Sequence, residues 1–355
     1  MGLQGSDDLL SSGSPTLPWL TAELPGTSGS IKGSPGDFVV EEIPAYEPTG
    51  EGPHVYVGLT REGETTQSLR RRLADALQIP PEWIGYAGLK DRHARTTQTF
   101  SILREDGSDL PALELDGVEV TTPPKRHRNK LKPGHLLGNR FEITVRDLDC
   151  PPADALVRAE AVAKALTPTG WPNYFGPQRQ GVHGDNSVQG LAILRRKSKR
   201  RQKPWLRKLL LSAWQSERFD TWLAARISSG AFDGLLEGDV AKKTDTGGLF
   251  DVEDPAVELP RLRAHDIVYT GPMYGSKMRA PTPTSSPAAV AEAAILAEIE
   301  LPDDAFKRAR LPGTRRPGRI HPADLSVKAE DDALVFRFFL PKGAYATTVL
   351  REFLK

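Results

Sequence analysis

Short stretches in which apolar and polar residues alternate recur through the first 150 residues. Four segments have the alternation or the β-branched content that is typical of strands. They are residues 36–46 (GDFVVEEIPAY), residues 53–60, Gln98–Leu103 and Asn139–Val145 (NRFEITV). A strongly apolar run, Leu334–Leu340, predicts another strand close to the C-terminus. The pattern therefore predicts strands at both ends of the chain.

Other stretches have the longer period of helices. One helix is predicted behind a cap at Thr65 or Thr66, with an apolar face made by Leu69, Leu73, Ala76 and Leu77. Pro80-Pro81 is expected to end this helix. Further helices are predicted over Pro152–Leu166, around Leu209–Ile227 and over Ala288–Glu300. Strands and helices that alternate indicate an α/β or an α+β class.

Composition changes this picture little. A chain of 355 residues suggests two domains, and no apolar run of about 18 residues predicts a membrane span. The first residues, MGLQGSDDLLSSGSPTLP, lack the order of a signal peptide and are expected to form a flexible tail. The single cysteine, Cys150, excludes an internal disulfide and a thiolate zinc cluster, which favours a reducing, cytoplasmic setting.

The distribution of charge is more informative than the net charge of +1. Arg195–Lys208 is basic at nine of its fourteen positions, and Lys125–Lys132 (KRHRNKLK) and Lys307–Arg319 are also rich in basic residues. Basic residues gathered on one surface can bind a phosphate backbone even in a chain of low net charge. Solvated helix faces or loops are the alternative interpretation.

Several kinds of catalytic site have no matching motif in the sequence. The seven histidines are scattered, without the H-E-x-x-H spacing of a zinc hydrolase. There is no G-x-x-x-x-G-K-[ST] loop, no strand-linked G-x-G-x-x-G and no G-x-S-x-G elbow. We therefore expect no metal, nucleotide or redox cofactor.

The candidate for catalysis is Asp91, which lies in the segment GLKDRHAR. Its basic neighbours Lys90, Arg92, His93 and Arg95 favour the ionised carboxylate, which is the nucleophilic form, and would also attract phosphates. From these residues alone, a turn cap or a surface ion pair is the favoured role for Asp91.

Aromatic residues beside polar side chains suggest recognition of an unstacked base. The aromatic residues are Phe38, Phe141, Tyr174, Phe175 and Tyr345, next to Asp37, Asn139, Gln178 and Arg179. An aromatic face can stack on a base while an amide pairs with its edge. Core packing is the alternative for each ring.

The segment GYAGLKDRHARTTQTFSI closely resembles the motif of the TruD family of pseudouridine synthases that contains the nucleophilic aspartate. Four further segments resemble motifs of that family and occur in the same order along the chain as in the family: IKGSPGDFVVEE, GNRFEI, NYFGPQR and FFLPKGAYATTVLREF. The resemblance therefore extends over residues 31–353. One departure is Gln180, which replaces an aromatic residue of the family and argues against stacking at that position.

The resemblance implies roles for individual residues. Asp91 would be the nucleophile, Lys32 and Phe38 would help form the pocket, Asn139 would bind the target nucleotide with support from Phe141, and Tyr345 would lie against the uracil. We further expect Arg92, Arg179, Arg200, Arg201 and Lys203 to bind RNA.

The resemblance also implies a function and a fold. The function is isomerisation of uridine to pseudouridine in transfer RNA, at position 13, without a cofactor and without an implied protein partner. A catalytically inactive RNA-binding protein, or another carboxylate-based RNA-modifying enzyme, stays open as an alternative.

The implied fold is α+β, with a mixed, largely antiparallel sheet, flanking helices and an inserted α/β domain. We expect a tail at 1–30, a discontinuous catalytic domain at 31–154 and 313–355, and the insertion at 155–312.

Overall fold

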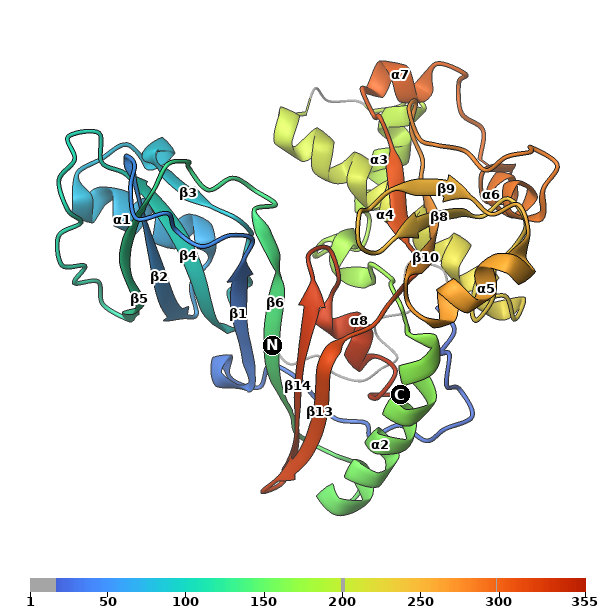
Figure 1. Cartoon of the computed structure of the whole chain (residues 1–355), viewed down its shortest axis with the longest axis horizontal. Helices are drawn as coiled ribbons and strands as arrows, with labels where there is room; N and C mark the ends of the chain where they lie inside the picture. The colour runs from blue at the N-terminus through green and yellow to red at the C-terminus, as the bar shows by residue number, and fades with distance from the viewer. Residues whose placement is uncertain (1–16, 199–201, 298) are drawn as a thin grey trace.

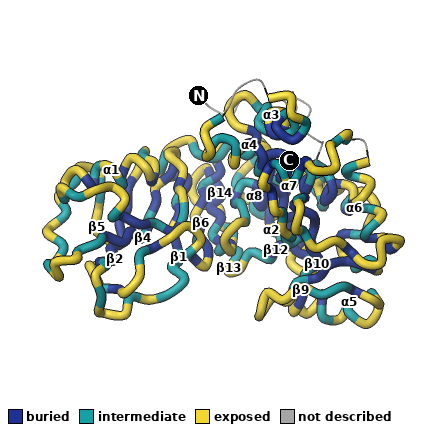
Figure 2. The backbone as a smooth tube through the Cα atoms, turned by 90° about the horizontal axis from the view of Figure 1, so that it is seen from above, coloured by how far each residue is buried: buried dark blue, intermediate teal, exposed yellow. Residues whose placement is uncertain are grey.

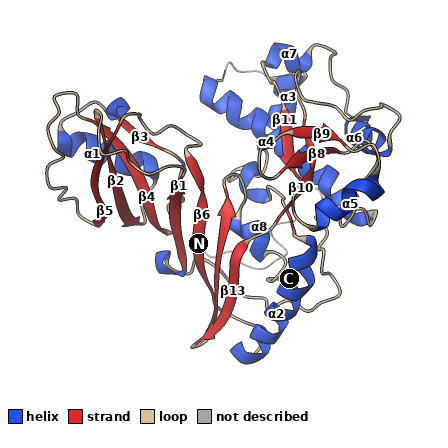
Figure 3. Ribbon diagram, in the orientation of Figure 1, coloured by secondary structure: helices blue, strands red, loops and turns tan. Residues whose placement is uncertain are grey.

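The computed structural model describes residues 17–198, 202–297 and 299–355. Two larger sheets, one two-stranded sheet and the helices around them make up most of the described chain (Figures 1 and 3). The larger sheet is built from β1 (Phe38–Pro44), β2 (His54–Glu62), β3 (Ile84–Tyr86), β4 (Arg95–Leu103), β5 (Val118–His127), β6 (Leu136–Val145), β13 (Ala323–Glu330) and β14 (Ala333–Pro341). Its order is β13-β14-β6-β1-β4-β2-β5, with β3 also paired to β4.

Only β1 and β4 run parallel in this sheet, and every other pair is antiparallel. The expected mixed, largely antiparallel α+β architecture is thus confirmed. Strand β14 pairs with β6 along its length, with Phe338 opposite Phe141 and Leu340 opposite Asn139. The two ends of the chain therefore meet in one sheet, as the motif order predicted.

A smaller sheet has the order β11-β10-β8-β9. Its strands are β8 (Val240–Lys243), β9 (Leu249–Asp251), β10 (Ile267–Met273) and β11 (Thr314–Pro317), while β7 (Trp171–Pro172) pairs separately with β12 (Arg319–Ile320). Around it lie α3 (Asn186–Leu194), α4 (Pro204–Ser228), α5 (Pro255–Arg263), α6 (Pro287–Ala297) and α7 (Ala305–Ala309). Helix α4 contributes Phe219, Trp222 and Leu223 to the core that it shares with this sheet.

Two apolar cores lie on the same face of the larger sheet. Helix α1 (Thr66–Leu77) packs Leu69 and Leu73 against β2 and β4, whereas α2 (Pro152–Thr169) and α8 (Ala346–Leu350) share a core with β6 and β14. Between these cores the strands carry polar residues on this face, among them Glu42, Gln98 and Asn139. Figure 2 shows buried residues along both sheets, with exposed residues around them.

Several local expectations are corrected by the structure. Helix α1 is capped by Thr65, whose side chain accepts a hydrogen bond from the Ser68 N–H, but it ends at Gln78 in a left-handed conformation (φ 53°), before the prolines. Ala76 is exposed, and Ala74 is buried in its place. Helix α2 continues to Thr169, with Pro168 inside its last turn.

The expected tail is packed where the structure describes it. Residues 17–30 lie against the C-terminal segment: Thr21 and Thr27 are buried, and the Glu352 carboxylate accepts hydrogen bonds from the N–H groups of Leu20 and Thr21. The Thr27 N–H also donates to the Phe353 carbonyl. These contacts replace the expected flexibility because they satisfy buried polar groups. Residues 1–16 lie outside the described chain.

The division into domains stays a prediction. Helix α2 packs against β13 and β14 through Ala155, Ala159, Val162 and Leu166, although an insertion that begins at residue 155 would include it. None of the described helices has both the length and the apolar character needed to cross a membrane.

Candidate active site

Asp91 lies in the connection between β3 and β4, and its side chain is about half exposed (48%). The Lys32 Nζ donates a hydrogen bond to Asp91 Oδ2 over 2.5 Å. Lys32 has a left-handed backbone (φ 66°). An ion pair between segments 59 residues apart shows that the fold, and not only local sequence, sets the environment of the carboxylate.

The charge state of Asp91 results from two opposed effects. Burial opposes ionisation, but the hydrogen bond and the charge of Lys32 outweigh it and lower the pKa of Asp91. The backbone N–H groups of His93 and Arg92 act in the same direction. The carboxylate is therefore held ionised, accessible and next to a cation, as a nucleophile requires.

Phe38 and Phe141 form the apolar side of this site. The Lys32 ammonium lies 4.6 Å from the centre of the Phe38 ring, which meets Phe141 edge-on at 6.1 Å. Both rings are buried (6% and 7% exposed) and belong to the core shared with α2 and α8. Phe38 and Phe141 therefore connect Asp91 and Lys32 to the main core.

A buried polar network beneath Asp91 was not predicted from the sequence. The neighbour of Asp91, Lys90, turns inward: its Nζ lies 2.8 Å from Glu42 Oε2 and donates to Asn139 Oδ1 over 2.6 Å. The side chains of Lys90 and Glu42 are only 5% and 1% exposed. Lys90 therefore fixes the orientation of the Asn139 amide, so that Nδ2 is the donor end of that side chain.

The same network holds the segment before Asp91 on the sheet. The Gln98 amide donates to Glu42 Oε2 over 3.1 Å and to the Gly88 carbonyl over 2.7 Å. The backbone N–H of Lys90 donates to the hydroxyl of Thr66, which in turn donates to Gln98. Residues 88–90 are thus anchored on three sides, which fixes the backbone from which Asp91 projects.

The first glycine of the motif has a structural role. A Cβ at Gly85 would lie 2.4 Å from the Leu131 carbonyl oxygen, so only glycine fits there. The small size of Gly85 thus allows close contact with the connection between β5 and β6.

Tyr345 belongs to a second cluster. Its hydroxyl accepts a hydrogen bond from Arg179 Nε over 3.0 Å, and its ring lies 5.9 Å from that of Phe175. Among the described residues, no hydrogen bond, ion pair or ring contact joins Tyr345 to Asp91. The structure therefore brings Asp91, Lys32, Phe38 and Phe141 together, adds Asn139 through Lys90, and leaves Tyr345 with Arg179.

Sequence reasoning missed Arg316, which organises this second cluster. Its guanidinium donates to the carbonyl of Asn173 and to that of Gly343, and lies 3.8 Å from the centre of the Phe175 ring. It thereby joins the NYFG segment to the turn before Tyr345. Burial lowers the pKa of Arg316 to about 10, so that the side chain stays cationic at neutral pH.

A buried carboxylate supports the NYFG segment. Asp220 accepts hydrogen bonds from the N–H groups of Phe175 (2.8 Å) and Gly176 (3.0 Å). Burial nevertheless raises the pKa of Asp220 to about 7. The rings of Tyr174 and Phe175 are themselves buried (1% and 5% exposed), so that core packing accounts for both.

The basic segments differ in their environment. In Lys307–Arg319, Arg315 forms a buried ion pair with Glu292 at 2.6 Å and Arg319 is 3% exposed, which excludes this run as a continuous surface patch. Arg92 and Lys203 are exposed, and Arg179 is partly exposed. Arg200 and Arg201 lie outside the described residues.

No cluster of histidine, cysteine, aspartate or glutamate side chains suited to a metal ion occurs in residues 17–198, 202–297 and 299–355.

Comparisons with known proteins extend over almost the entire chain. The family model described as tRNA pseudouridine synthase D (TruD) matches residues 16–201 and 196–353. A protein named tRNA pseudouridine synthase D from Anaeromyxobacter sp. strain Fw109-5 is 43% identical over 348 residues, which cover 95% of this chain and 96% of that protein. A protein of that name from Thermus thermophilus is also 43% identical, with coverage of 95% and 92%.

The fold has a solved counterpart. A crystal structure from Methanosarcina mazei, assigned to tRNA pseudouridine synthase D (TruD), superposes with a TM-score of 0.76 at 24% identity and covers 95% of both chains. At this level of identity the likeness establishes the fold.

Proposed function

Because the chain belongs to the tRNA pseudouridine synthase D (TruD) family, we propose that it converts uridine to pseudouridine in transfer RNA. The reaction breaks the C1′–N1 bond of the nucleotide, turns the uracil and joins C1′ to C5. The hydrogen on C5 leaves as a proton, and N1 gains one. Product and substrate contain the same atoms, so the reaction calls for no redox partner, nucleotide or metal.

The observation that carries this proposal is the pairing of Asp91 with Lys32. An ionised carboxylate, half exposed and held 2.5 Å from an ammonium group, suits nucleophilic attack on the flipped nucleotide. Lys32 stabilises the anion before the reaction. In this proposal Asp91 is the catalytic residue and Lys32 maintains its charge.

Four further residues are proposed to form the site for the target nucleotide. Lys90 occupies the Asn139 Oδ1, so the remaining amide group is a donor suited to a carbonyl or hydroxyl oxygen of the nucleotide. Extruding a base from its stack costs a few kcal/mol, and stacking on an aromatic ring recovers about 1–3 kcal/mol. We assign that stacking to Tyr345, with Phe38 and Phe141 as the apolar support of the site.

The geometry imposes a condition on this assignment. Since none of the described contacts joins Tyr345 to Asp91, the nucleotide itself must bridge the two groups. Arg179 is placed to contact both the Tyr345 hydroxyl and a nearby phosphate, since its guanidinium has further donors beyond Nε. Arg92, next to the nucleophile, is exposed and is proposed to contact RNA as well.

A wider RNA-binding surface is proposed on the insertion. Lys203 is exposed at the start of α4, and Arg200 and Arg201 belong to the same basic run of the sequence. The packing of α2 against β13 and β14 supports an insertion that begins near residue 170, later than the sequence pattern predicted. We propose position 13 as the target and the cytoplasm as the site of action, on the basis of the family motifs and the single cysteine.

The direct test uses unmodified transfer RNA. We expect incubation with the protein to produce pseudouridine at position 13, mapped by carbodiimide modification or mass spectrometry. Formation at another position would correct the target and retain the chemistry. Release of free uracil, or intact RNA without pseudouridine, would overturn the proposed function.

A further inference from the structure

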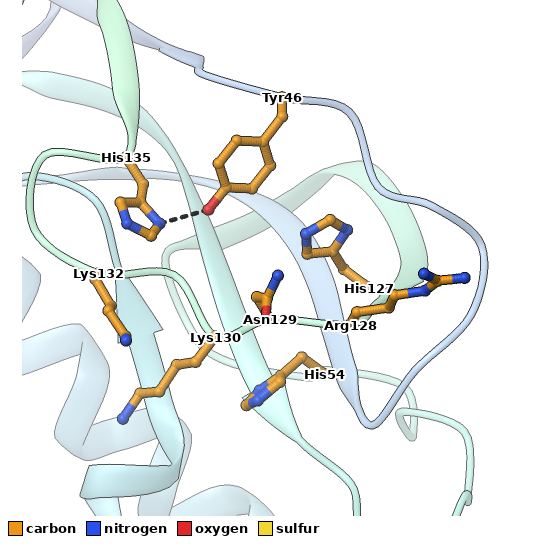
Figure 4. Close-up of a pocket in the computed structure, with 8 residues that line it drawn as sticks. All are labelled: Tyr46, His54, His127, Arg128, Asn129, Lys130, Lys132 and His135. Carbon is orange, nitrogen blue, oxygen red and sulfur yellow. Dashed lines mark hydrogen bonds between the residues drawn. The ribbon is translucent and has the colours of Figure 1, made fainter.

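A basic hollow of about 520 Å³ lies at the end of the larger sheet where β2 begins and β5 ends (Figure 4). It is lined by Tyr46, His54, His127, Arg128, Asn129, Lys130, Lys132 and His135. None of these residues is acidic. In a chain with a net charge of only +1, a hollow lined by cations and imidazoles points to an anionic ligand.

The aromatic wall of the hollow is fixed by packing. The His127 side chain stacks on Tyr46 at 5.2 Å with an angle of 19° between the rings, and Tyr56 contacts it from a second side at 4.7 Å. The Nδ1 of His127 accepts a hydrogen bond from the Thr49 N–H over 3.2 Å, so that the proton of the neutral ring lies on Nε2. The hydroxyl of Tyr46 pairs with Nδ1 of His135 (Figure 4).

The imidazoles of His127, which is buried, and His54, which is partly buried, favour the neutral form. Burial lowers the pKa of His127, assisted by Arg128, and burial lowers the pKa of His54, assisted by Lys130 and His127. The His54 Nδ1 is buried and has no hydrogen-bond partner within the described chain. These rings therefore contribute N–H donors more than charge.

The positive charge comes from the connection between β5 and β6. Lys130 donates to the Glu82 carbonyl, and its pKa is lowered by burial and by the charges of Arg70 and Lys132. The side chain of Lys132 is exposed and has no acidic partner among the described residues. Arg128 pairs with Glu51 at the rim. The lining contains no acidic residue to stabilise these neighbouring lysine charges. A bound anion would therefore stabilise their protonated form.

This connection is also tied to the catalytic segment. The Gly134 N–H donates to the carbonyl of Ala87, four residues before Asp91, and the Lys342 ammonium in the turn before Tyr345 donates to the Gly134 carbonyl. In Figure 1 the β5–β6 connection and the start of α4 both lie at the upper side of the molecule. An RNA that meets the basic start of α4 on this side would therefore also meet the hollow.

We propose that this hollow binds a phosphate group of the RNA backbone, outside the nucleotide that is isomerised. This proposal rests on the function proposed above. The Lys130 and Lys132 ammonium groups and the imidazole N–H groups supply donors to the phosphate oxygens. Bound in this way, the backbone would be anchored to the same connection that holds the Asp91 segment.

The test is the salt dependence of RNA binding. Each neutralised phosphate contributes about 0.7–0.9 to the slope of log K against log salt, so Lys130→Gln together with Lys132→Gln, which removes the one proposed phosphate contact, should flatten the slope by about 0.7–0.9. Fluorescence anisotropy of labelled transfer RNA at several salt concentrations measures this change. Lys328→Gln is the matched control, because Lys328 is an exposed lysine on β13, at the opposite edge of the sheet, and should leave the slope unchanged.

Two parallel measurements separate the possible outcomes. Pseudouridine formation by the double variant should show a larger change in KM than in kcat, and calorimetric titration with inorganic phosphate should show weaker binding than to wild type. Unchanged salt slopes overturn the proposal, and so does a loss confined to inorganic phosphate, which would mean that the hollow takes only a small anion. If the slope flattens while the wild type forms no pseudouridine, the hollow binds RNA and the proposed activity is wrong.

Discussion

Lys32 Nζ and Asp91 Oδ2 lie 2.5 Å apart, although 59 residues separate them in the sequence. Lys32 precedes β1 and Asp91 precedes β4, and these two strands are the parallel pair of the larger sheet. Because parallel strands begin at the same edge, the segments before them are brought together. The one parallel pair therefore creates the ion pair on which the proposed nucleophile depends.

Replacing Lys32 should alter the pH dependence of the reaction. Without its charge, burial of the carboxylate is less opposed and the pKa of Asp91 rises, so the acidic limb of the kcat/KM profile of Lys32→Gln should move to higher pH. At a pH below this limb, the variant should be about tenfold less active than wild type for each unit by which the pKa of Asp91 rises. Rates of pseudouridine formation between pH 4 and pH 9 measure the shift. A lower rate with an unmoved limb would contradict this role of Lys32.

Lys90→Met should destabilise the fold as well as reduce activity. It leaves the Glu42 carboxylate buried without its cation, and none of the described residues forms a hydrogen bond with Glu42 Oε1. Breaking a buried pair in this way costs about 3–5 kcal/mol, which urea denaturation can measure.

Arg95→Gln provides the matched control for Lys90, because it removes an ion pair near the same segment. Arg95 and its partner Glu62 are both about half exposed (46% and 47%), so the loss should stay below about 1 kcal/mol. Equal losses in the two variants would show that the Lys90 network does not anchor the catalytic segment.

Tyr345 should act through its ring. Tyr345→Phe keeps the face that meets Phe175 and loses only the hydrogen bond from Arg179, which is partly exposed and can bind water instead. We expect its turnover to stay within about threefold of wild type, whereas Tyr345→Ala, which removes a stack worth about 1–3 kcal/mol, should lose at least about fivefold. Single-turnover rates measure both. A similar loss in both variants would assign the role to the hydroxyl.

Asp220 should make stability depend on pH. Burial raises the pKa of Asp220 from 3.8 to about 7 in the folded protein, so the folded state binds more protons between these values. Its contribution to the free energy of unfolding therefore falls as pH rises from about 4 to about 7. Asp220→Asn cannot titrate and should flatten that part of the stability profile, as followed by urea denaturation. Parallel profiles for the two proteins would contradict the raised pKa.

Much of the fold could be predicted from local patterns. β6, β14 and α4 follow alternating, apolar or helical periods that one stretch of sequence displays. The end of α1 could not be predicted, because a left-handed Gln78 ended the helix before the prolines did. The packing of residues 17–30 depends on Glu352, over 300 residues away, and so leaves no local signal.

The candidate site divides in the same way. Motif order singled out Asp91, Lys32 and Asn139 as candidates, but the inward turn of Lys90 depends on Glu42 and on a sheet that joins distant segments. Arg316 carried a signal only as part of a basic run, and that run suggested an RNA-binding surface instead of a bridge between Asn173 and Gly343. Charge runs do not reveal which members turn inward, because burial depends on distant partners.

The central claim is that Asp91 attacks the nucleotide during isomerisation. Joining C1′ to C5 displaces the C5 hydrogen, so transfer RNA labelled with tritium at uridine C5 releases its label when pseudouridine forms. We predict tritium release by the wild type and less than about one per cent of that rate with Asp91→Asn, while the affinity for RNA stays within about tenfold, because the change removes a nucleophile and almost no binding surface. Tritium release by Asp91→Asn at a rate near that of the wild type would contradict the account.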